Sequence, residues 1–482
     1  MTTIDIARKD TICAPATPAG RSALAVIRVS GPASWNVLRR IFWPRHGKEI
    51  QPFVATVGSV KGWADGQAAH DVPLQQQPTV DEAVCVAYPP GRSYTGEAGF
   101  ELSVHGNPLL VQAVLQLLQR VGCRLARAGE FSMRAVLSGK LDLCQAQGVY
   151  NVIHARSLRA CEAALQAVAG CLSDQLQRAR GHLVEALGLI EAQLDFPDDV
   201  EHEHVAAVRE HLQVVLGIVD KLLASAAWGM RLQAGARVVL CGAPNAGKST
   251  LLNALVDDHK ALVHHRPGTT RDFIEVPWQI DGVAITLVDV AGLRNAQQAG
   301  DVERMGMQQA YKQLQRADVV LWLVDARCVR LQQAFAQPPG PLGNTPVIPL
   351  LTKADLCDHS CMNAAVSQQS AAATVNFATA ALWISAHNGR GLQQLQQQLQ
   401  RLLTQDSVSQ QEPVLTTQQQ YNLVQQVQQA TAYAATTLQQ NRPHEVVAAL
   451  LREAGQAFDE LLGSNLSEDV LQTIFSRFCI GK

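Results

Sequence analysis

The chain has 482 residues, which at about 150 residues per domain predicts roughly three domains. Hydrophobic residues make up 47% and charged residues 17%, a globular composition that excludes wholesale disorder and collagen-like or coiled-coil folds. The formal charge is −2, from 40 basic and 42 acidic side chains. No global positive field therefore indicates a nucleic-acid-binding protein, and any RNA contact has to be local.

No apolar run approaches the roughly 20 residues that a transmembrane helix needs. The N-terminal MTTIDIARKD also lacks the order of charged and apolar residues found in secretory signals. The eleven cysteines contain no CxxC pair, and Cys357 and Cys361 have no matching metal ligands nearby in sequence. We therefore expect a cytoplasmic protein with no membrane partner and with reduced, mostly buried thiols.

Residues 1–139 are predicted to form an α+β domain. Short β-type runs at 23–29, 53–60 and 82–88 are separated by Gly- and Pro-rich segments. An amphipathic helix is predicted over 108–121.

Residues 140–234 and 405–482 are predicted to be the two halves of a helical domain. The first half has two apolar stripes at helical spacing, which we interpret as core-facing sides of a bundle. One stripe is Leu165, Leu172, Leu176, Leu183, Leu187, Ile190 and Leu194, and the other is Val208, Leu212, Val215, Val219 and Leu222. The Gln-rich stretch 393–440 keeps leucines at the same spacing, which favours solvated helices, and 361–380 is predicted to be a loop insertion.

Residues 235–404, between these halves, are predicted to form an inserted α/β domain. Near-continuous Val, Ile and Leu strands alternate with helices, a pattern typical of a parallel sheet with helices on both faces. The predicted strands are 237–241, 284–289, 319–325, 347–352 and 381–385.

A phosphate-binding motif follows the first of these strands. Gly242 to Ser249 reads GAPNAGKS and matches G-x-x-x-x-G-K-[ST] between a predicted strand and a predicted helix. Backbone N–H groups of this loop wrap phosphates, Lys248 reaches the β and γ oxygens, and the Ser249 hydroxyl reaches Mg²⁺. Asp289 to Gly292 reads DVAG at the end of the next buried strand, which predicts Asp289 beside the metal and the Gly292 amide near the γ-phosphate.

Two further strand ends indicate a guanine site. Asp355, in the stretch TKAD, can accept hydrogen bonds from the guanine N1–H and N2 amino group, whereas the adenine edge would repel it. Ser385 and Ala386 end the last strand. Thr352 stands where GTPases usually have Asn, so we expect weaker affinity with the guanine preference kept. Leu293 stands where Ras-like enzymes place the water-orienting Gln, so another group must position the attacking water.

These motifs and their flanks resemble the bacterial tRNA-modification GTPases of the MnmE (TrmE) family over nearly the whole chain. The specific stretches are DTICAPATPAGRSALAVIRVSGP (10–32), RSYTGEAGFELSVHG (92–106), GEFSMRAVLSGKLDL (129–143), GTTRD (268–272) and the terminal SEDVLQTIFSRFCIGK. The resemblance implies a multidomain α/β fold: an α+β folate-binding N-terminal domain that dimerises, a central helical bundle, and an inserted Ras-like P-loop GTPase domain.

The resemblance also implies a function. Such an enzyme hydrolyses GTP to GDP and phosphate with Mg²⁺ and K⁺, and forms a homodimer that joins the flavoprotein MnmG in a heterotetramer. Together they use a one-carbon tetrahydrofolate, methylene- or formyl-, to add an aminomethyl or carboxymethylaminomethyl group at C5 of the wobble uridine of certain tRNAs.

Carried over by position, the family's folate contacts fall on Arg28, Glu101, Lys140 and Lys482. A Glu suits the N–H edge of a pterin, and cationic side chains suit a glutamate tail. The family's catalytic cysteine falls on Cys479, for which a buried structural thiol is the competing interpretation.

In the G domain the resemblance assigns catalytic roles to Lys248 and to Glu303, which would orient the attacking water through a second water. Thr270 joins Ser249 at Mg²⁺, and Asn245, His264, Arg266 and Thr269 would surround K⁺. Pro267 stiffens that loop compared with the family. The implied GTP contacts are Asn245, Ala246, Gly247, Lys248, Ser249, Thr250, Thr269, Thr270, Asp289, Gly292, Thr352, Lys353, Asp355, Ser385 and Ala386.

Two other functions remain open at this point. A ribosome-assembly GTPase would share the phosphate and guanine motifs, although not the folate-like N-terminal segments or the terminal CIGK. A one-carbon transferase with a vestigial G domain would fit if Thr352 and the altered loop at 264–267 abolished turnover.

Overall fold

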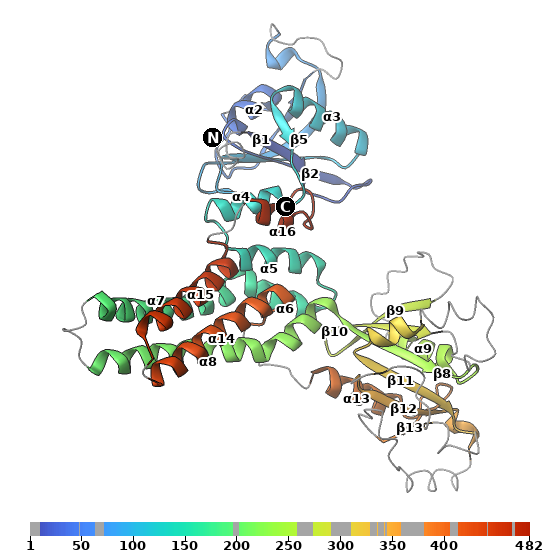
Figure 1. Ribbon diagram of the computed structural model, residues 1–482. Coiled ribbons are helices and arrows are strands. Elements are labelled where there is room, and N and C mark those ends of the chain that lie inside the picture. The colour runs from blue at the N-terminus through green and yellow to red at the C-terminus, as the bar shows by residue number, and fades with distance from the viewer. Residues whose placement is uncertain are drawn as a thin grey trace, which may run out of the picture. The chain divides into compact units, whose positions relative to one another are not determined.

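The computed structural model describes residues 10–47, 49–62, 72–195, 202–257, 273–290, 310–327, 335, 342, 345–357, 380–404, 413–440, 442–464 and 468–482. Internal contacts divide the chain into two compact units, which are described separately (Figure 1). The first comprises 1–150, 167–216 and 426–482, and the second comprises 151–166 and 217–425.

The first unit contains a seven-stranded sheet in the order β3-β4-β5-β6-β2-β1-β7. All neighbouring strands are antiparallel except β1 and β7. The strands are β1 (Thr11–Pro15), β2 (Leu24–Ser30), β3 (Phe42–Pro44), β4 (Thr56–Lys61), β5 (Thr79–Tyr88), β6 (Gly99–His105) and β7 (Cys123–Leu125). The associated helices are α2 (Ser34–Ile41), the 3₁₀ turn η1 (Leu74–Gln76), α3 (Pro108–Arg120) and α4 (Glu130–Leu137).

The apolar core of this sheet lies against α2 and α3. Side chains alternate between the two faces of a strand, so Ile27 and Val29 of β2 enter the core while Arg28 points to the opposite face. Phe100 and Leu102 of β6 enter the same core from the neighbouring strand. The β runs and the helix predicted from sequence are confirmed within a few residues, but β1, β3, β6 and β7 were not predicted as strands.

Long helices follow, as predicted. They are α5 (Leu143–His154), α6 (Leu158–Val168), α7 (Cys171–Asp195), α8 (His202–Ala234), α14 (Gln418–Gln439), α15 (His444–Leu462) and α16 (Glu468–Phe475). The stripe on α8 is buried as expected, from Val208 to Leu222. The first stripe was wrong as a single face, because Gly170 (φ +94°) separates α6 from α7 and Leu165 is 51% exposed. On α7 the buried face runs through Leu172, Leu176, Leu183 and Ile190.

The C-terminal segment packs beside α4. Phe475 and Phe478 form a buried cluster with Met133 and Leu143. A Cβ atom on Gly481 would lie 2.2 Å from the carbonyl oxygen of Pro15 in β1, and Gly481 has φ +93°. Only glycine fits this position, because both the backbone conformation and the close approach exclude a side chain.

The second unit contains a six-stranded sheet in the order β13-β12-β11-β8-β10-β9. The strands are β8 (Ala236–Gly242), β9 (Phe273–Ile280), β10 (Val283–Val290), β11 (Val319–Asp325), β12 (Val347–Thr352) and β13 (Leu382–Trp383). The helical elements are α9 (Lys248–Asp257), the 3₁₀ turn η3 (Ala354–Leu356) and α13 (Leu392–Thr404). The predicted parallel sheet is confirmed for five strands, but the edge strand β9 is antiparallel to β10.

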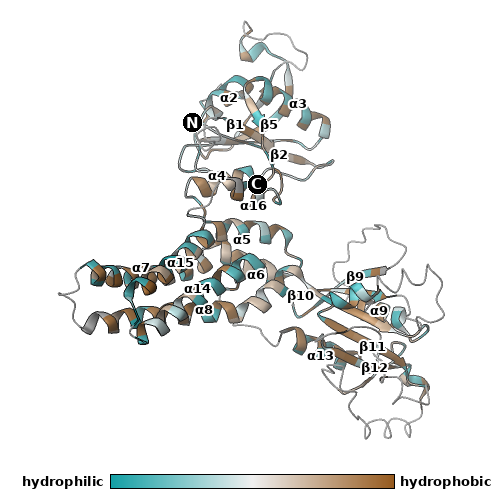
Figure 2. Ribbon diagram, in the orientation of Figure 1, coloured by the Kyte–Doolittle hydropathy of each residue, from teal (hydrophilic) through white to brown (hydrophobic). Residues whose placement is uncertain are grey.

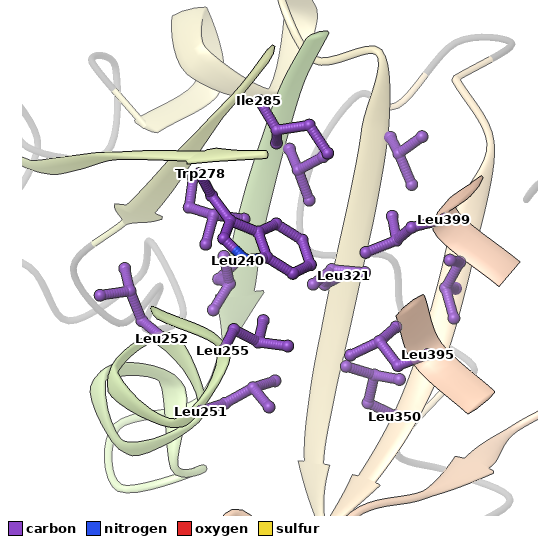
Figure 3. Close-up of a cluster of buried hydrophobic side chains, with 14 of the residues drawn as sticks. Leu240, Leu251, Leu252, Leu255, Trp278, Ile285, Leu321, Leu350, Leu395 and Leu399 are labelled. Carbon is purple, nitrogen blue, oxygen red and sulfur yellow. The ribbon is translucent and has the colours of Figure 1, made fainter. Parts of the chain in front are cut away.

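Figure 3 shows one apolar layer of this sheet. Leu251 and Leu255 project from α9 toward Leu240 on β8, and Leu395 and Leu399 project from α13. A second cluster, including Val239, Val288 and Trp322, covers the other face. In Figure 2 the strands β11 and β12 are largely hydrophobic, as expected for strands buried on both faces.

Among the described residues, one helix, Val205–Ala234, is long and apolar enough to cross a membrane by length and composition. Charged residues such as Arg209, Glu210, Asp220 and Lys221 occupy its other faces, and Leu212, Val215 and Val219 are fully buried in the fold. These features are typical of a core helix.

Candidate functional site

The phosphate motif forms a tight loop between β8 and α9. Gly242 has φ +156°, and a Cβ atom there would lie 2.4 Å from the carbonyl oxygen of Leu323, so the strand end requires glycine. Asn245 and Gly247 also have positive φ, of 65° and 89°. These turns place the loop at the N-terminus of α9, where unpaired N–H groups and the helix dipole favour an anion.

Lys248 is folded back onto this loop. Its Nζ donates to the carbonyl oxygens of Gly242 and Ala243, at 3.2 and 3.1 Å. Burial lowers the pKa of Lys248, and the nearby Asp289 carboxylate opposes that shift. A buried ammonium group beside a ring of N–H donors is arranged to meet phosphate oxygens.

Ser249 and Asp289, the two residues expected at Mg²⁺, are hydrogen-bonded to each other. The Ser249 hydroxyl donates to Asp289 Oδ2 at 2.7 Å. Asp289 Oδ1 is buried and has no hydrogen-bond partner among the described residues. A hydroxyl and a carboxylate with an unused buried oxygen are hard donors that suit Mg²⁺, so the residues fit this ion.

The guanine loops meet at the end of the sheet. Ser385 Oγ donates to Asp355 Oδ1 at 2.6 Å, and this hydrogen bond lowers the pKa of Asp355. Lys353 adopts the left-handed conformation with φ 58°, and its Nζ lies 2.7 Å from Asp325 Oδ2. The Asp355 carboxylate is therefore held in place as a hydrogen-bond acceptor, which is the chemistry that the predicted guanine contact requires.

Thr352 links the guanine loop to the phosphate loop. Its side chain is buried, and Oγ1 lies 2.7 Å from the carbonyl oxygen of Ala246 and 3.1 Å from that of Val324. The single hydroxyl proton can donate to one carbonyl oxygen at a time. This tether is a contact that the sequence comparison with Asn did not reveal.

We expect Thr352→Val to weaken binding of GDP by about 1 kcal/mol, or roughly fivefold, because the phosphate loop loses its hydrogen bond to the guanine loop. Thr352→Asn should tighten binding by about the same amount by adding an amide contact. Thr352→Ser keeps the hydroxyl and serves as the control. Titration of a fluorescent guanine nucleotide measures all three, and unchanged affinity in Thr352→Val would contradict the tether.

A second candidate site is a cavity of about 320 Å³ in the first unit. Arg28 on β2 and Glu101 on β6 are directly opposite in the sheet register, and their side chains pair at 2.8 Å between Nε and Oε1. Tyr88 donates to Glu101 Oε2 at 3.3 Å. The cavity is lined by Arg28, Val29, Ser30, Tyr88, Arg92, Ser93, Tyr94, Thr95, Gly99, Phe100 and Glu101.

The C-terminal residues reach this cavity. Arg28 Nη1 donates to the carbonyl oxygen of Gly481 at 3.2 Å, and the Arg28 guanidinium lies over the Tyr94 ring at 5.0 Å. Lys482 Nζ lies 5.9 Å from the centre of the same ring. Burial and the neighbouring Arg28 lower the pKa of Lys482. Two basic side chains, Arg28 and Lys482, thus lie close to the aromatic ring of Tyr94. Such a set suits a flat heterocycle that carries anionic groups.

The predicted folate-binding residues differ in their position relative to the cavity. Arg28 and Glu101 line the cavity, and Lys482 lies next to it. Lys140 is exposed and does not line the cavity; its Cγ lies beside Gly96 in the neighbouring loop. Cys479 is exposed, so the alternative of a buried structural thiol is wrong. Sequence reasoning missed Tyr88 and Tyr94, although Tyr94 falls inside the RSYTGEAGF stretch.

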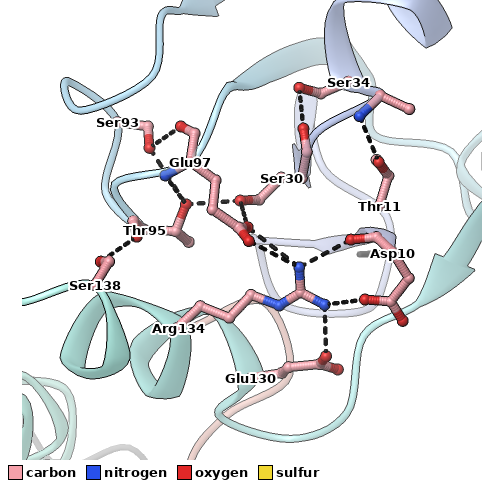
Figure 4. Close-up of polar contacts among 12 residues, drawn as sticks. Asp10, Thr11, Ser30, Ser34, Ser93, Thr95, Glu97, Glu130, Arg134 and Ser138 are labelled. Atoms are coloured by element: carbon pink, nitrogen blue, oxygen red, sulfur yellow. Dashed lines mark hydrogen bonds and ion pairs between the residues drawn. The ribbon is translucent and has the colours of Figure 1, made fainter. Parts of the chain in front are cut away.

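A charged cluster adjoins the polar wall of this cavity (Figure 4). The Arg134 side chain is 3% exposed and pairs with Asp10 at 2.5 Å, Glu130 at 3.0 Å and Glu97 at 3.2 Å. Arg124 pairs with Glu130 at 2.6 Å and with Asp10 at 2.7 Å. Ser30, which lines the cavity, donates to Glu97 at 2.7 Å. The cluster thus holds the loop around Glu97 against the sheet.

Several predicted site residues lie outside the described residues. They are His264, Arg266, Thr269, Thr270, Gly292 and Glu303. Of the proposed K⁺ ligands, the structure therefore describes Asn245.

Comparison with known proteins identifies relatives of the whole chain. The family model "GTP-binding protein TrmE N-terminus" matches residues 11–140, and "MnmE helical domain" matches 143–479. The tRNA modification GTPase MnmE of Chlorobium chlorochromatii is 36% identical over 475 residues, covering 98% of both chains. That of Thermotoga petrophila is 33% identical, covering 98% of this chain and all of its own. Among solved structures, the G domain of the T. maritima FeoB iron transporter aligns with 35% of this chain and 98% of its own at 22% identity, with a TM-score of 0.24.

Proposed function

The chain belongs to the MnmE family of tRNA-modification GTPases, and we propose that it hydrolyses GTP to GDP and phosphate during modification of C5 of the wobble uridine in certain tRNAs. The observation that carries this proposal is the match of both family models, which together span 11–479 apart from two residues. A ribosome-assembly GTPase would not require the TrmE-type N-terminal domain, so that alternative is disfavoured.

The GTP site of the proposal is built on the phosphate and guanine loops. Lys248 meets the β and γ oxygens, and Asp355 with Ser385 recognises guanine. Ser249 and Asp289 hold Mg²⁺, which neutralises charge on the phosphates when bound. Asn245 is a proposed K⁺ ligand together with Thr269 and the backbone carbonyls of His264 and Arg266, and Glu303 positions the attacking water.

The folate site of the proposal is the cavity that contains Arg28 and Glu101. The Glu101 carboxylate accepts from the N–H edge of a pterin, and Tyr94 offers a face for stacking. Arg28 pairs with Glu101 at 2.8 Å and so holds that carboxylate in place at the pterin end, while Arg28 and Lys482 together supply positive charge beside a bound methylene- or formyl-tetrahydrofolate. Cys479 is exposed in the segment that reaches this cavity, consistent with a chemical role in transfer of the one-carbon unit.

We further propose the partners and the domain organisation of the chain. The chain acts in the cytoplasm as a homodimer, joins the flavoprotein MnmG in a heterotetramer, and binds tRNA. Its proposed domains are 1–139, the helical halves 140–234 and 405–482, and the G domain 235–404 inserted between them.

The proposal is tested by mass spectrometry of wobble uridines in tRNA from a strain that lacks this protein. We expect the C5-modified nucleosides to disappear and to return when the intact gene is restored. Normal modification, with accumulation of immature ribosomal particles instead, would overturn the proposal and favour the ribosome-assembly alternative.

We expect Glu101→Gln to weaken binding of a tetrahydrofolate to the full chain by at least tenfold, because a neutral amide replaces a charged acceptor. The same exchange at Glu82, whose side chain is 60% exposed, is the matched control and should leave binding unchanged. Isothermal titration calorimetry measures both. Equal affinity in wild type and Glu101→Gln would remove Glu101 from the site.

A further inference from the structure

Three potential metal ligands converge between two long helices of the first unit. His182 and Glu185 are three residues apart on α7, which places them on one side of that helix, and His211 lies on α8. The two histidine Nδ1 atoms are 2.9 Å apart. Glu185 Oε2 is 3.3 Å from the His211 Nδ1 and 3.8 Å from the His182 Nδ1.

These distances fit a metal ion. The point equidistant from the corners of a triangle with these three sides lies about 2.0 Å from each corner, which is close to the metal–ligand distances of zinc sites. The imidazole side chains are partly buried, while Glu185 is 63% exposed and opens the site to solvent. An ion can therefore enter without opening the helix pair.

A hydrogen bond between the two rings accounts for only part of this arrangement. One neutral imidazole donates its Nδ1 proton to the Nδ1 of the other, which explains the distance of 2.9 Å. It does not require a carboxylate oxygen to approach both of these nitrogen atoms as well. A metal ion at the point equidistant from the three atoms would be coordinated by both nitrogen atoms and by the carboxylate oxygen.

We propose that His182, Glu185 and His211 bind one late first-row divalent cation, with Zn²⁺ as its representative, and with water at the remaining position. Two imidazoles and one carboxylate are a donor set that favours Zn²⁺ over Mg²⁺ or Ca²⁺, which prefer oxygen ligands. Three protein ligands with one open position are also the composition of zinc sites that retain a bound water. This site is separate from the nucleotide and folate sites and does not depend on the proposed function.

The ion would join α7 to α8. Helix α7 ends at Asp195 and α8 begins at His202, so His182 and His211 lie in consecutive helices of the chain. Binding to the folded state alone stabilises that state by mass action, so the metal would raise the melting temperature. The Mg²⁺ ligands proposed above are in the other unit and contain no histidine.

The test uses the full-length chain, stripped with a chelator and titrated with Zn²⁺ by calorimetry. The variants are His211→Ala and Glu185→Ala, and the exposed Glu185 side chain makes unfolding of the second variant a minor concern. His46→Ala, which removes an exposed histidine from the N-terminal domain, is the matched control. We expect a Zn²⁺ site that weakens at least tenfold in both variants and is unchanged in His46→Ala.

Co²⁺ provides a second readout that does not depend on enthalpy. Bound to two imidazoles and a carboxylate, it should give visible d–d absorption in wild type and His46→Ala that is lost in His211→Ala. Far-UV circular dichroism confirms that each variant is folded. Identical Zn²⁺ titrations and identical Co²⁺ spectra in wild type and both site variants would overturn the proposal.

Discussion

Arg134→Met is expected to lower the free energy of unfolding by about 3 kcal/mol or more, the cost of breaking a buried ion pair from one side. Arg134 is surrounded by the carboxylates of Asp10, Glu97 and Glu130, and Glu130 is itself only 3% exposed (Figure 4). Without the Arg134 guanidinium, Asp10 and Glu130 would keep an ion pair with Arg124 only. Glu97 would lose its ion pair with Arg134. Denaturant unfolding of the full chain measures the difference.

A matched control separates burial from the mere loss of an arginine. Arg45 pairs with Glu82 at 3.5 Å, and both side chains are about 60% exposed. Arg45→Met should therefore cost less than about 1 kcal/mol. Equal losses in the two variants would show that the buried cluster contributes no more than an exposed pair.

The same cluster predicts a pH dependence. Burial alone would raise the pKa of Asp10 and of Glu130, but hydrogen bonds from the arginines outweigh it, so both pKa values lie below their ordinary ones. Carboxyls with depressed pKa stabilise the fold above the unfolded pKa and lose that contribution as the pH falls through the folded value. The stability difference between wild type and Arg134→Met should thus shrink below about pH 4. A difference that stays constant down to pH 3 would contradict this account.

Glu303→Ala is expected to lower the single-turnover rate of GTP hydrolysis by at least about 100-fold while GTP affinity changes little. Leu293 stands where Ras-like enzymes place their water-orienting Gln, so the attacking water needs another acceptor. The family resemblance assigns that role to Glu303, in the stretch DVER, acting through a second water. A K⁺ ion near Asn245 would compensate charge that develops between the β- and γ-phosphates, in place of an arginine finger.

Rapid-quench kinetics with saturating enzyme measures this rate in K⁺ and, separately, in Na⁺. Glu275→Ala removes an exposed acid from β9 of the same domain and should hydrolyse GTP at the wild-type rate. Normal hydrolysis by Glu303→Ala would exclude this residue as the water-positioning group. Equal turnover in Na⁺ and K⁺ would show that the stretch His264 to Pro267 has lost the cation site.

Local sequence patterns were sufficient to predict the loop between β8 and α9 and the class of fold. The family, the multidomain α/β fold and the GTPase class predicted from the motifs are confirmed by the comparisons. The phosphate loop was predictable because its function depends on backbone conformation over eight consecutive residues. Asp289 and Asp355 were predictable because strands of a parallel sheet end at one edge.

Contacts between distant residues were not predictable from the residues alone. The pairing of Arg28 with Glu101 depends on the register between β2 and β6, and Tyr88 enters from a third strand. The break at Gly170 was missed because the leucine spacing continues across it, although the helix does not. The antiparallel direction of β9 depends on the tight turn at Asp281 and Gly282, which have φ of 47° and 76°.

The hydrogen bond from Thr352 to the phosphate loop was likewise not predictable from the motif. Comparison with the usual Asn predicted only a lost contact, because a motif records residue types and not the atoms around them. In the fold, the hydroxyl reaches the carbonyl oxygen of Ala246, which is 106 positions away in sequence. A substitution that weakens one interaction can therefore form another.

Because α16 and Gly481 pack against the N-terminal domain, this domain can finish folding only after residues 468–482 have been synthesised. Arg28 leaves the ribosome 453 residues before Gly481, whose carbonyl oxygen it contacts in the finished fold. Once Met133 and Leu143 have been synthesised, they lack Phe475 and Phe478, the aromatic partners that bury them, until those residues emerge as well. A nascent chain thus presents an apolar patch beside an unfinished cavity throughout most of translation, and we expect chaperones to bind it there until the final helix emerges.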